Sequence, residues 1–197
     1  MASVSIDKLD QLSLLILFAI NATNGKALNE THLQKIMFQT MKVLKTNPDN
    51  VGYRAHYFGP YSDMIKESKD SLESLGYITE KNGKIVISDL VKEKVTEIKP
   101  PTEEIGFKIK TVAKYLSELK HDELLLMIYC DDLDINDGRY LENSQIKNEI
   151  MNNRVPIAIG MYRSGKISIG RAAELAGTDI REFQNELTKR FGAVYVN

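Results

Sequence analysis

Side chains that could bind a ligand are concentrated near the C-terminal end of the sequence, at the spacing of one helix face. Arg181, Gln184 and Asn185 lie three and four residues apart, and Thr188 and Lys189 continue the same face one turn later. An arginine can bond guanine, a glutamine or asparagine can bond adenine, and a lysine can neutralise a phosphate. The pattern therefore predicts contacts with double-stranded DNA. The predicted DNA-binding residues of this region are Arg171, Thr178, Arg181, Gln184, Asn185, Thr188 and Lys189.

The residues around this face have the features of a helix-turn-helix motif. Two helices that cross closely need small residues at the crossing, which Ala172, Ala173 and Ala176 supply. Gly177 can take the positive φ that ends the first helix, and Asp179 can cap the second. The predicted inner face of the second helix consists of Ile180, Phe183 and Leu187.

The charges of the chain are unevenly distributed although the net charge is only −1. Residues 1–120 contain 17 basic and 15 acidic residues, residues 121–150 contain 2 and 8, and residues 151–197 contain 7 and 4. This distribution favours one localised basic surface at the C-terminal end and argues against a protein that coats DNA uniformly. Because Glu182 and Glu186 lie on the same predicted helix, a helical hairpin with a mixed-charge surface is the alternative.

The first 99 residues have the pattern of a winged-helix domain. Apolar periodicity and capping residues predict helices at 6–21, 29–44 and 62–75, capped by Asn29 in the second and Ser62 in the third. A short strand is expected at 52–58, and Asn82-Gly83 predicts a hairpin between 77–80 and 84–87. Ser88 could cap a further helix to residue 98.

The third of these helices is poorly suited to DNA. It is expected to expose Lys66 and Lys69, but four acidic residues accompany them: Asp63, Glu67, Asp70 and Glu73. Such a face repels phosphate. Lys81 and Lys84 on the hairpin could still contact a DNA backbone, so they complete the predicted set. A protein-interaction or dimerisation role is the stronger prediction for this domain.

A helical and acidic connector is expected at residues 100–152, followed by the helix-turn-helix domain at 153–197. Helices are predicted at 102–119, 122–129 and 144–151, and another begins at Pro156. The end, Val194-Tyr195-Val196, has strand character and could pair across a dimer.

Two parts of the sequence resemble known families. The motif Phe58-Gly59-Pro60-Tyr61-Ser62, together with 32–38 and 75–78, resembles prokaryotic SocA-like, Panacea-type winged-helix domains. Residues 157–197, with Arg171-Ala172-Ala173-Glu174-Leu175-Ala176-Gly177 at their centre, resemble small archaeal and bacterial antitoxin-like proteins often encoded beside PIN-domain toxins. The second resemblance implies DNA binding by the corresponding helices and a partner held near the C-terminus. The large N-terminal domain departs from the small free-standing form of that family.

Catalytic, metal and membrane functions are not expected. His32, His56 and His121 have no neighbours at metal-ligand or triad spacing, and His32 is expected to face solvent. The acidic stretch from Asp132 lacks the glycine and glutamate that a calcium loop requires at positions six and twelve. Cys130 fits a structural thiol. No apolar run is long enough to span a bilayer and no basic leader precedes one, so a cytoplasmic protein without a cofactor is expected.

The sequence thus predicts a mainly α protein with a small β component, composed of a winged-helix domain and a C-terminal helix-turn-helix domain. The predicted function is that of a homodimeric transcriptional regulator, not an enzyme, that binds double-stranded DNA. Control of a toxin-antitoxin-like operon is a narrower possibility. The alternative is an adaptor or antitoxin that binds a partner protein, such as a toxin, without DNA.

Overall fold

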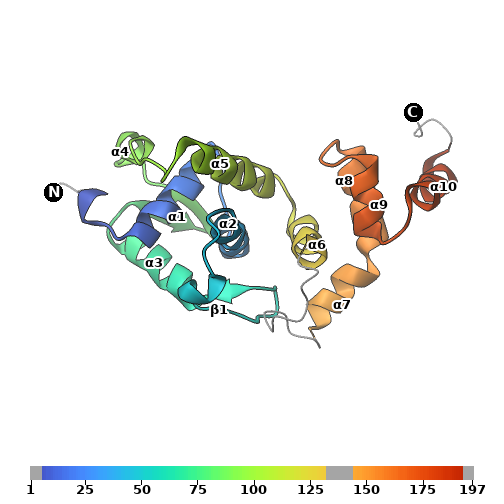
Figure 1. Cartoon of the computed structure of the whole chain (residues 1–197), viewed down its shortest axis with the longest axis horizontal. Helices are drawn as coiled ribbons and strands as arrows, with labels where there is room; N and C mark the ends of the chain where they lie inside the picture. The colour runs from blue at the N-terminus through green and yellow to red at the C-terminus, as the bar shows by residue number, and fades with distance from the viewer. Residues whose placement is uncertain (1–5, 132–143, 193–197) are drawn as a thin grey trace. The chain divides into compact units, whose positions relative to one another are not determined.

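The computed structural model describes residues 6–131 and 144–192 and is mainly helical, with two small antiparallel sheets (Figure 1). The predicted fold class, mainly α with a small β component, is confirmed. The described chain divides into two compact units, one of residues 6–56 and 60–119 and one of residues 57–59, 120–131 and 144–192. The connector expected at 100–152 is divided between them, its first helix lying in the first unit and the other two in the second.

The first unit is a cluster of helices with a β-hairpin. Helix α1 packs against α2, α3, α4 and α5, and α5 also lies along α2. Apolar side chains recur every three or four residues along each helix, and together they form the core. Each of four helices contributes a fully buried residue of this kind: Ile16, Leu33, Ile65 and Ile109. The elements in chain order are η1 (Ile6–Lys8), α1 (Gln11–Asn21), α2 (Glu30–Val43), η2 (Pro48–Val51), β1 (Tyr53–Arg54), β2 (Tyr61–Ser62), α3 (Asp63–Ser74), β3 (Ile78–Lys81), β4 (Lys84–Ile87), α4 (Lys92–Thr96) and α5 (Glu103–Ser117).

Side-chain caps set most helix starts in this unit. Asn29 and Ser62 accept the expected backbone hydrogen bonds at the starts of α2 and α3, so these two predicted caps are confirmed. The predicted helix at 6–21 is instead divided, because Asp10 accepts from the Ser13 N–H and starts α1 anew. The predicted cap at Ser88 is wrong, since α4 begins at Lys92. Its N-cap residue is Val91, which makes no side-chain cap hydrogen bond.

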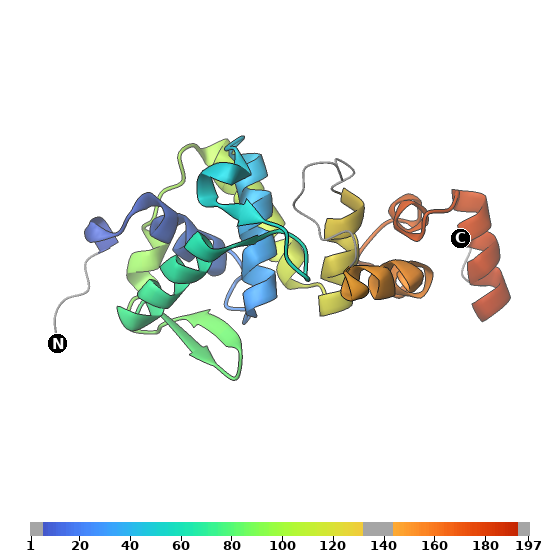
Figure 2. The same cartoon turned by 90° about the horizontal axis from the view of Figure 1, so that it is seen from below.

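The predicted hairpin at Asn82-Gly83 is confirmed. Strands β3 and β4 pair with Ile78 opposite Ile87 and Lys81 opposite Lys84. Asn82 and Gly83 both have positive φ, 53° and 69°, which is the geometry of a type I′ turn. Figure 2 shows the hairpin projecting from the first unit.

The strand expected at 52–58 is shorter than predicted. A paired strand forms at Tyr53–Arg54, opposite Tyr61–Ser62, and His56 adds an isolated β-bridge. The end of β2 is held by α2, where the Gln34 side chain bonds both the N–H and the carbonyl of Ser62, each at 3.0 Å. Hydrogen bonds from a neighbouring helix therefore replace a longer strand ladder here.

Two polar residues expected to face solvent are buried, and both predictions were wrong. His32 bonds the Asn29 side chain at 2.8 Å and the Leu119 carbonyl at 2.9 Å, because α5 ends beside α2. Lys69 is only 5% exposed and pairs with Glu80 at 2.6 Å and Asp70 at 2.8 Å. These carboxylates raise the pKa of Lys69 above its usual value despite its burial.

The regular elements described in the second unit are all helices. Helix α8 packs on α9, α9 on α10, and α6 contacts α7, α8 and α9. Glu123 in α6 accepts from the Lys120 N–H at 2.7 Å and from the Lys166 ammonium at 2.5 Å, which fixes the segment before α9. The helices are α6 (His121–Asp131), α7 (Gln145–Asn152), α8 (Arg154–Arg163), α9 (Ile169–Ala176) and α10 (Ile180–Phe191). The calcium-loop comparison from Asp132 and the terminal strand at 194–196 lie outside the described residues.

Candidate nucleic-acid interface

Helices α9 and α10 form a helix-turn-helix within the second unit (Figure 1). Gly177 ends α9 at φ 68° and ψ 37°. The N–H of Gly177 bonds the Glu174 carbonyl and that of Thr178 bonds the Ala173 carbonyl, both at 3.0 Å, which is a Schellman ending. Asp179 and Glu182 then form a reciprocal capping box at the start of α10. The turn and both predicted boundary residues are confirmed.

The packing of the motif agrees with the predicted small-residue crossing, with one exception. Ala172, Ala173 and Ala176 are buried, and so are Phe183 and Leu187 on the inner face of α10. Ile180 was predicted to share that face but is 49% exposed. Its Cδ1 approaches Gly170, and a residue without a side chain cannot cover it.

The predicted DNA-contacting face of α10 lies opposite its buried residues. Arg181, Asn185, Thr188 and Lys189 are exposed, and Gln184 is half-buried at the margin. The Thr188 hydroxyl donates to the Gln184 carbonyl at 3.0 Å, so its oxygen can still accept a hydrogen bond. One side of α10 therefore presents amide, hydroxyl and cationic groups together, as contact with a groove of DNA requires.

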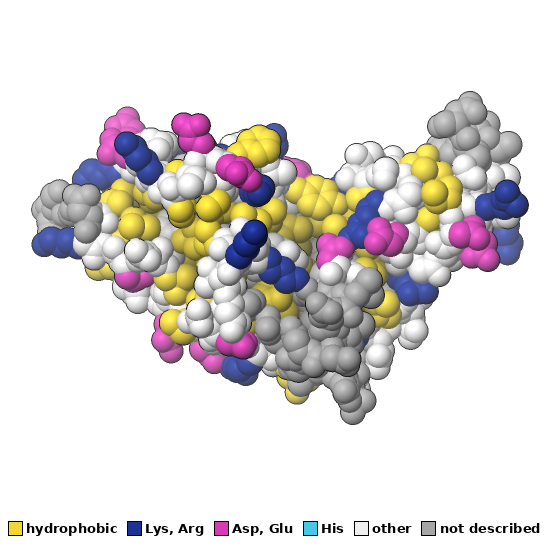
Figure 3. Space-filling model, viewed as in Figure 1, with side chains coloured by type: hydrophobic (Ala, Val, Ile, Leu, Met, Phe, Trp, Pro, Cys, Tyr) yellow, Lys and Arg dark blue, Asp and Glu magenta, His cyan; other side chains and the backbone are white. Residues whose placement is uncertain are grey.

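The acidic residues of α10 are engaged within the helix. Glu186 accepts from Arg190 at 2.5 Å, a hydrogen bond that lowers the pKa of the Glu186 carboxyl, and Glu182 belongs to the capping box. Within the described chain, neither Arg181 nor Lys189 forms an ion pair. Figure 3 shows basic and acidic side chains side by side around α10. The charge around α10 is mixed, but Arg181 and Lys189 on its outward face remain available to bind an anionic group.

Arg171 and Thr178 lie away from that face. The Arg171 guanidinium pairs with Asp131 at the end of α6 and with Glu174 at 2.7 Å. The Thr178 hydroxyl oxygen is buried and has no hydrogen-bond partner among the described residues. A DNA contact by Arg171 would have to compete with two carboxylates. The structure places neither Arg171 nor Thr178 on the outward face of α10 that contains Arg181. Their DNA contacts stay predictions.

Lys81 and Lys84 stand opposite each other at the tip of the hairpin in the first unit, both exposed. Like charges directly opposite in a hairpin are destabilising, and an anion between them would relieve this repulsion. The contact of Lys81 and Lys84 with a DNA backbone stays a prediction.

Two arginines of α8 were not predicted to take part in the motif. An Arg154 nitrogen lies 3.5 Å from the Gly177 carbonyl, and the Arg163 guanidinium lies 4.0 Å from the centre of the Phe191 ring. They brace the turn and the far end of α10. No spacing signal in the sequence joins them to α10, because both contacts depend on how α8 packs.

Gly177→Ala is expected to lower the free energy of unfolding by about 1–2 kcal/mol, because a β-carbon disfavours left-handed backbone. An additional loss is expected, since the new Cβ would lie 1.9 Å from the present position of an Arg154 nitrogen. Gly165→Ala is the matched control, with φ 71° and no atom within 4 Å of its added Cβ. Thermal denaturation of both variants tests this. Equal losses would show that Arg154 moves aside without cost.

The described residues offer little for other chemistry. None of the described helices is long and apolar enough to cross a membrane. No cluster of three or more metal-binding side chains occurs in the described ranges. Burial raises the pKa of the Cys130 thiol, which disfavours a reactive thiolate at neutral pH.

Fold and site together define a mainly helical protein whose C-terminal unit contains a helix-turn-helix. Residues 141–194 match the uncharacterised protein family UPF0175. A UPF0175 protein of Halobacterium salinarum is 46% identical over 37 residues, which cover 19% of this chain and 38% of that protein. The similarity is therefore one of a segment, and the first 140 residues lie outside the family match. No solved structure matches the chain.

Proposed function

We propose that this protein is a transcriptional regulator that binds double-stranded DNA through α10. The observation that carries the proposal is the outward face of α10, where Arg181, Asn185, Thr188 and Lys189 lie opposite the buried Phe183 and Leu187. The Schellman turn and capping box fix the angle at which this face is presented. Such a helix fits the major groove, with cations for phosphates and amides for bases.

A homodimer with the first unit as a winged-helix domain completes the proposal. One short helix makes few base contacts, and two-fold pairing would double them on a palindromic site. The succession of α1, α2, α3 and the β3–β4 hairpin supports a winged helix, with Lys81 and Lys84 on the wing. The match of residues 141–194 to UPF0175 supports the narrower possibility of an antitoxin-like protein that controls its own operon.

A second candidate is an adaptor or antitoxin that binds a partner protein without DNA. Helix α3 favours it, because Asp63, Glu67 and Asp70 are exposed there while Lys69 is buried. Helix α3 contains two basic and four acidic residues between Asp63 and Glu73, and Lys66 is the exposed cation among these six. An acidic helix of this kind suits a basic protein surface better than a phosphate backbone.

Fluorescence anisotropy with pooled duplex DNA separates the two candidates. We expect binding at about 50 mM salt that weakens steeply as salt is raised, because each phosphate contact releases counterions. Lys189→Ala should reduce the slope of log K against log salt by about 1. Absence of binding at low salt would reject the DNA proposal and leave the adaptor.

Arg181→Ala should weaken binding to a selected operator by roughly 5- to 150-fold, the cost of losing one bidentate base contact. Gln184→Ala should relax sequence preference at a neighbouring position. Lys108→Ala is the charge control, because Lys108 is an exposed lysine of α5 paired with Glu104 at 2.5 Å. If Arg181→Ala and Lys108→Ala bind equally well, α10 does not contact bases.

A further inference from the structure

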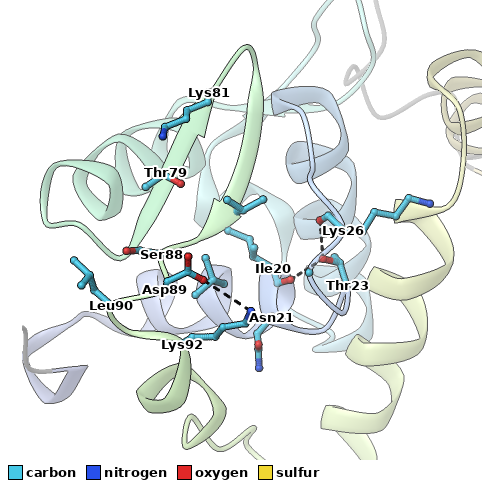
Figure 4. A pocket seen from close by; sticks show the side chains of 13 residues that line it. Ile20, Asn21, Thr23, Lys26, Thr79, Lys81, Ser88, Asp89, Leu90 and Lys92 are labelled. Carbon is cyan, nitrogen blue, oxygen red and sulfur yellow. Dashed lines mark hydrogen bonds and ion pairs between the residues drawn. The ribbon is translucent and has the colours of Figure 1, made fainter.

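The first unit contains a hollow of about 470 Å³ beside the β3–β4 hairpin (Figure 4). It lies between the end of α1 with the turn that follows, the strands β3 and β4, and the segment before α4. This volume is within the range of small-molecule sites. Its lining includes Asn21, Thr79, Lys81, Ser88, Leu90 and Lys92.

Several polar groups in the wall of the hollow have no partner. The side chains of Asn21, Thr79, Ser88 and Lys81 make no hydrogen bond or ion pair with any residue the structure describes. Ser88 is a largely buried residue at the hollow, and its hydroxyl makes no side-chain hydrogen bond among the described residues. Asn21 and Thr79 are half-buried and Lys81 is exposed, so these polar groups are accessible in the wall of the hollow and can bond a ligand there.

The charge of the wall selects an anion. Lys26, Lys81 and Lys92 line it against a single carboxylate, Asp89. Lys26 is paired with Glu118, and Lys92 lies 4.0 Å from Asp89. Lys81 is therefore the cation left without a carboxylate, and Figure 4 shows it on β3 together with Thr79. A hydroxyl and an ammonium from one strand can hold one anionic group.

The remaining wall is apolar. Ile20, which is almost fully buried, forms part of the floor, and Val86 and Ile87 of β4 line the hollow. Leu90 lies at the rim and is 78% exposed. An exposed leucine beside a polar hollow can cover the apolar part of a ligand. A free inorganic ion would leave this surface unused.

We propose that this hollow binds a small organic anion, one that combines an apolar body with one carboxylate, sulfonate or phosphate group. Lys81 and Thr79 hold the anionic group, Asn21 and Ser88 bond its polar edge, and Leu90 covers the apolar body. The site is contained in the first unit and does not depend on DNA binding by α10, so either proposal can fail alone.

The test is a fluorescence titration of the full chain with 8-anilinonaphthalene-1-sulfonate, an apolar sulfonate that brightens in an apolar site. We expect saturable binding that Lys81→Gln weakens roughly tenfold, the effect of one charge-assisted hydrogen bond. Thr79→Phe should also weaken it, because an aromatic side chain suits a strand and would occupy the hollow. The control is Lys84→Gln, which removes the same charge directly opposite Lys81 but outside the hollow.

Amide chemical shifts report where the probe binds. Movement of the Asn21, Lys81 and Ser88 signals on titration, with unchanged melting temperatures of the variants, would support the site. Equal affinities of the Lys81→Gln, Lys84→Gln and unaltered proteins would overturn it, as would shifts confined to other exposed apolar residues such as Phe107.

Discussion

Phe183→Ala is expected to lower the free energy of unfolding of the second unit by about 3–5 kcal/mol, the usual loss for truncating a buried aromatic residue. Phe183 is 1% exposed and is the largest side chain that α10 buries. Its ring meets that of Tyr162 edge to face, with centroids 6.3 Å apart, so the substitution also removes an aromatic pair between α8 and α10. Urea denaturation followed by circular dichroism measures the loss.

Phe191→Ala provides the matched control on the same helix. Phe191 is 36% exposed and contacts the Arg163 guanidinium, so its loss should cost less than about 1 kcal/mol, the size of an exposed cation–π contact. Similar losses for the two variants would contradict the view that Phe183 anchors α10. If Phe183 is the anchor, its truncation should also remove any DNA binding that depends on the angle of α10.

The anchoring residues of the motif were predictable because they depend on local geometry. The i, i+4 spacing of Phe183 and Leu187, the positive φ at Gly177 and the cap at Asp179 each follow from a few consecutive residues. The caps at Asn29 and Ser62 and the turn at Asn82-Gly83 were predictable for the same reason. Helix ends and tight turns satisfy backbone groups locally, so the sequence contains their signal.

Predictions failed where a side chain meets a distant part of the chain. His32 bonds a carbonyl 87 residues away, and Lys69 meets Glu80 because the hairpin folds back on α3. Ile180 has an apolar type and the right spacing, but it faces a glycine. Periodicity gives the face on which a residue lies and not the partner on the other side.

The burial of Lys69 changes the interpretation of the first unit. Sequence alone suggested two exposed lysines on α3, and the structure buries one of them, Lys69, in ion pairs with Asp70 and Glu80. Any DNA contact by this unit would then depend on the hairpin lysines and not on α3. The two proposals then assign different partners to the two units, DNA to α10 and a small anion or a protein to the first unit.

Lys35 gives the largest expected pH effect. It is 1% exposed, its ammonium nitrogen lies 2.7 Å from the Pro60 carbonyl, and no carboxylate of the described chain pairs with it. Burial lowers the pKa of Lys35 to about 7. An unfolded chain keeps lysine protonated up to a pKa of about 10.4, so between these values the unfolded state binds more protons than the folded state. The free energy of unfolding must therefore rise with pH across this window.

We expect a gain of roughly 2 kcal/mol between pH 7 and pH 9 that is specific to Lys35. Lys35→Met should lose this gain because methionine cannot titrate, while Lys84→Met, which changes an exposed lysine, should keep it. Arg54 is present in all three proteins. The pKa of His56 is lowered from its usual value of 6.5 by burial and by the charges of Lys35 and Arg54, so His56 titrates mainly below the pH window compared. Urea titrations at four pH values give the slopes. Parallel curves for the unaltered protein and Lys35→Met would mean that the buried ammonium stays charged when folded, stabilised by the Pro60 carbonyl and its surroundings.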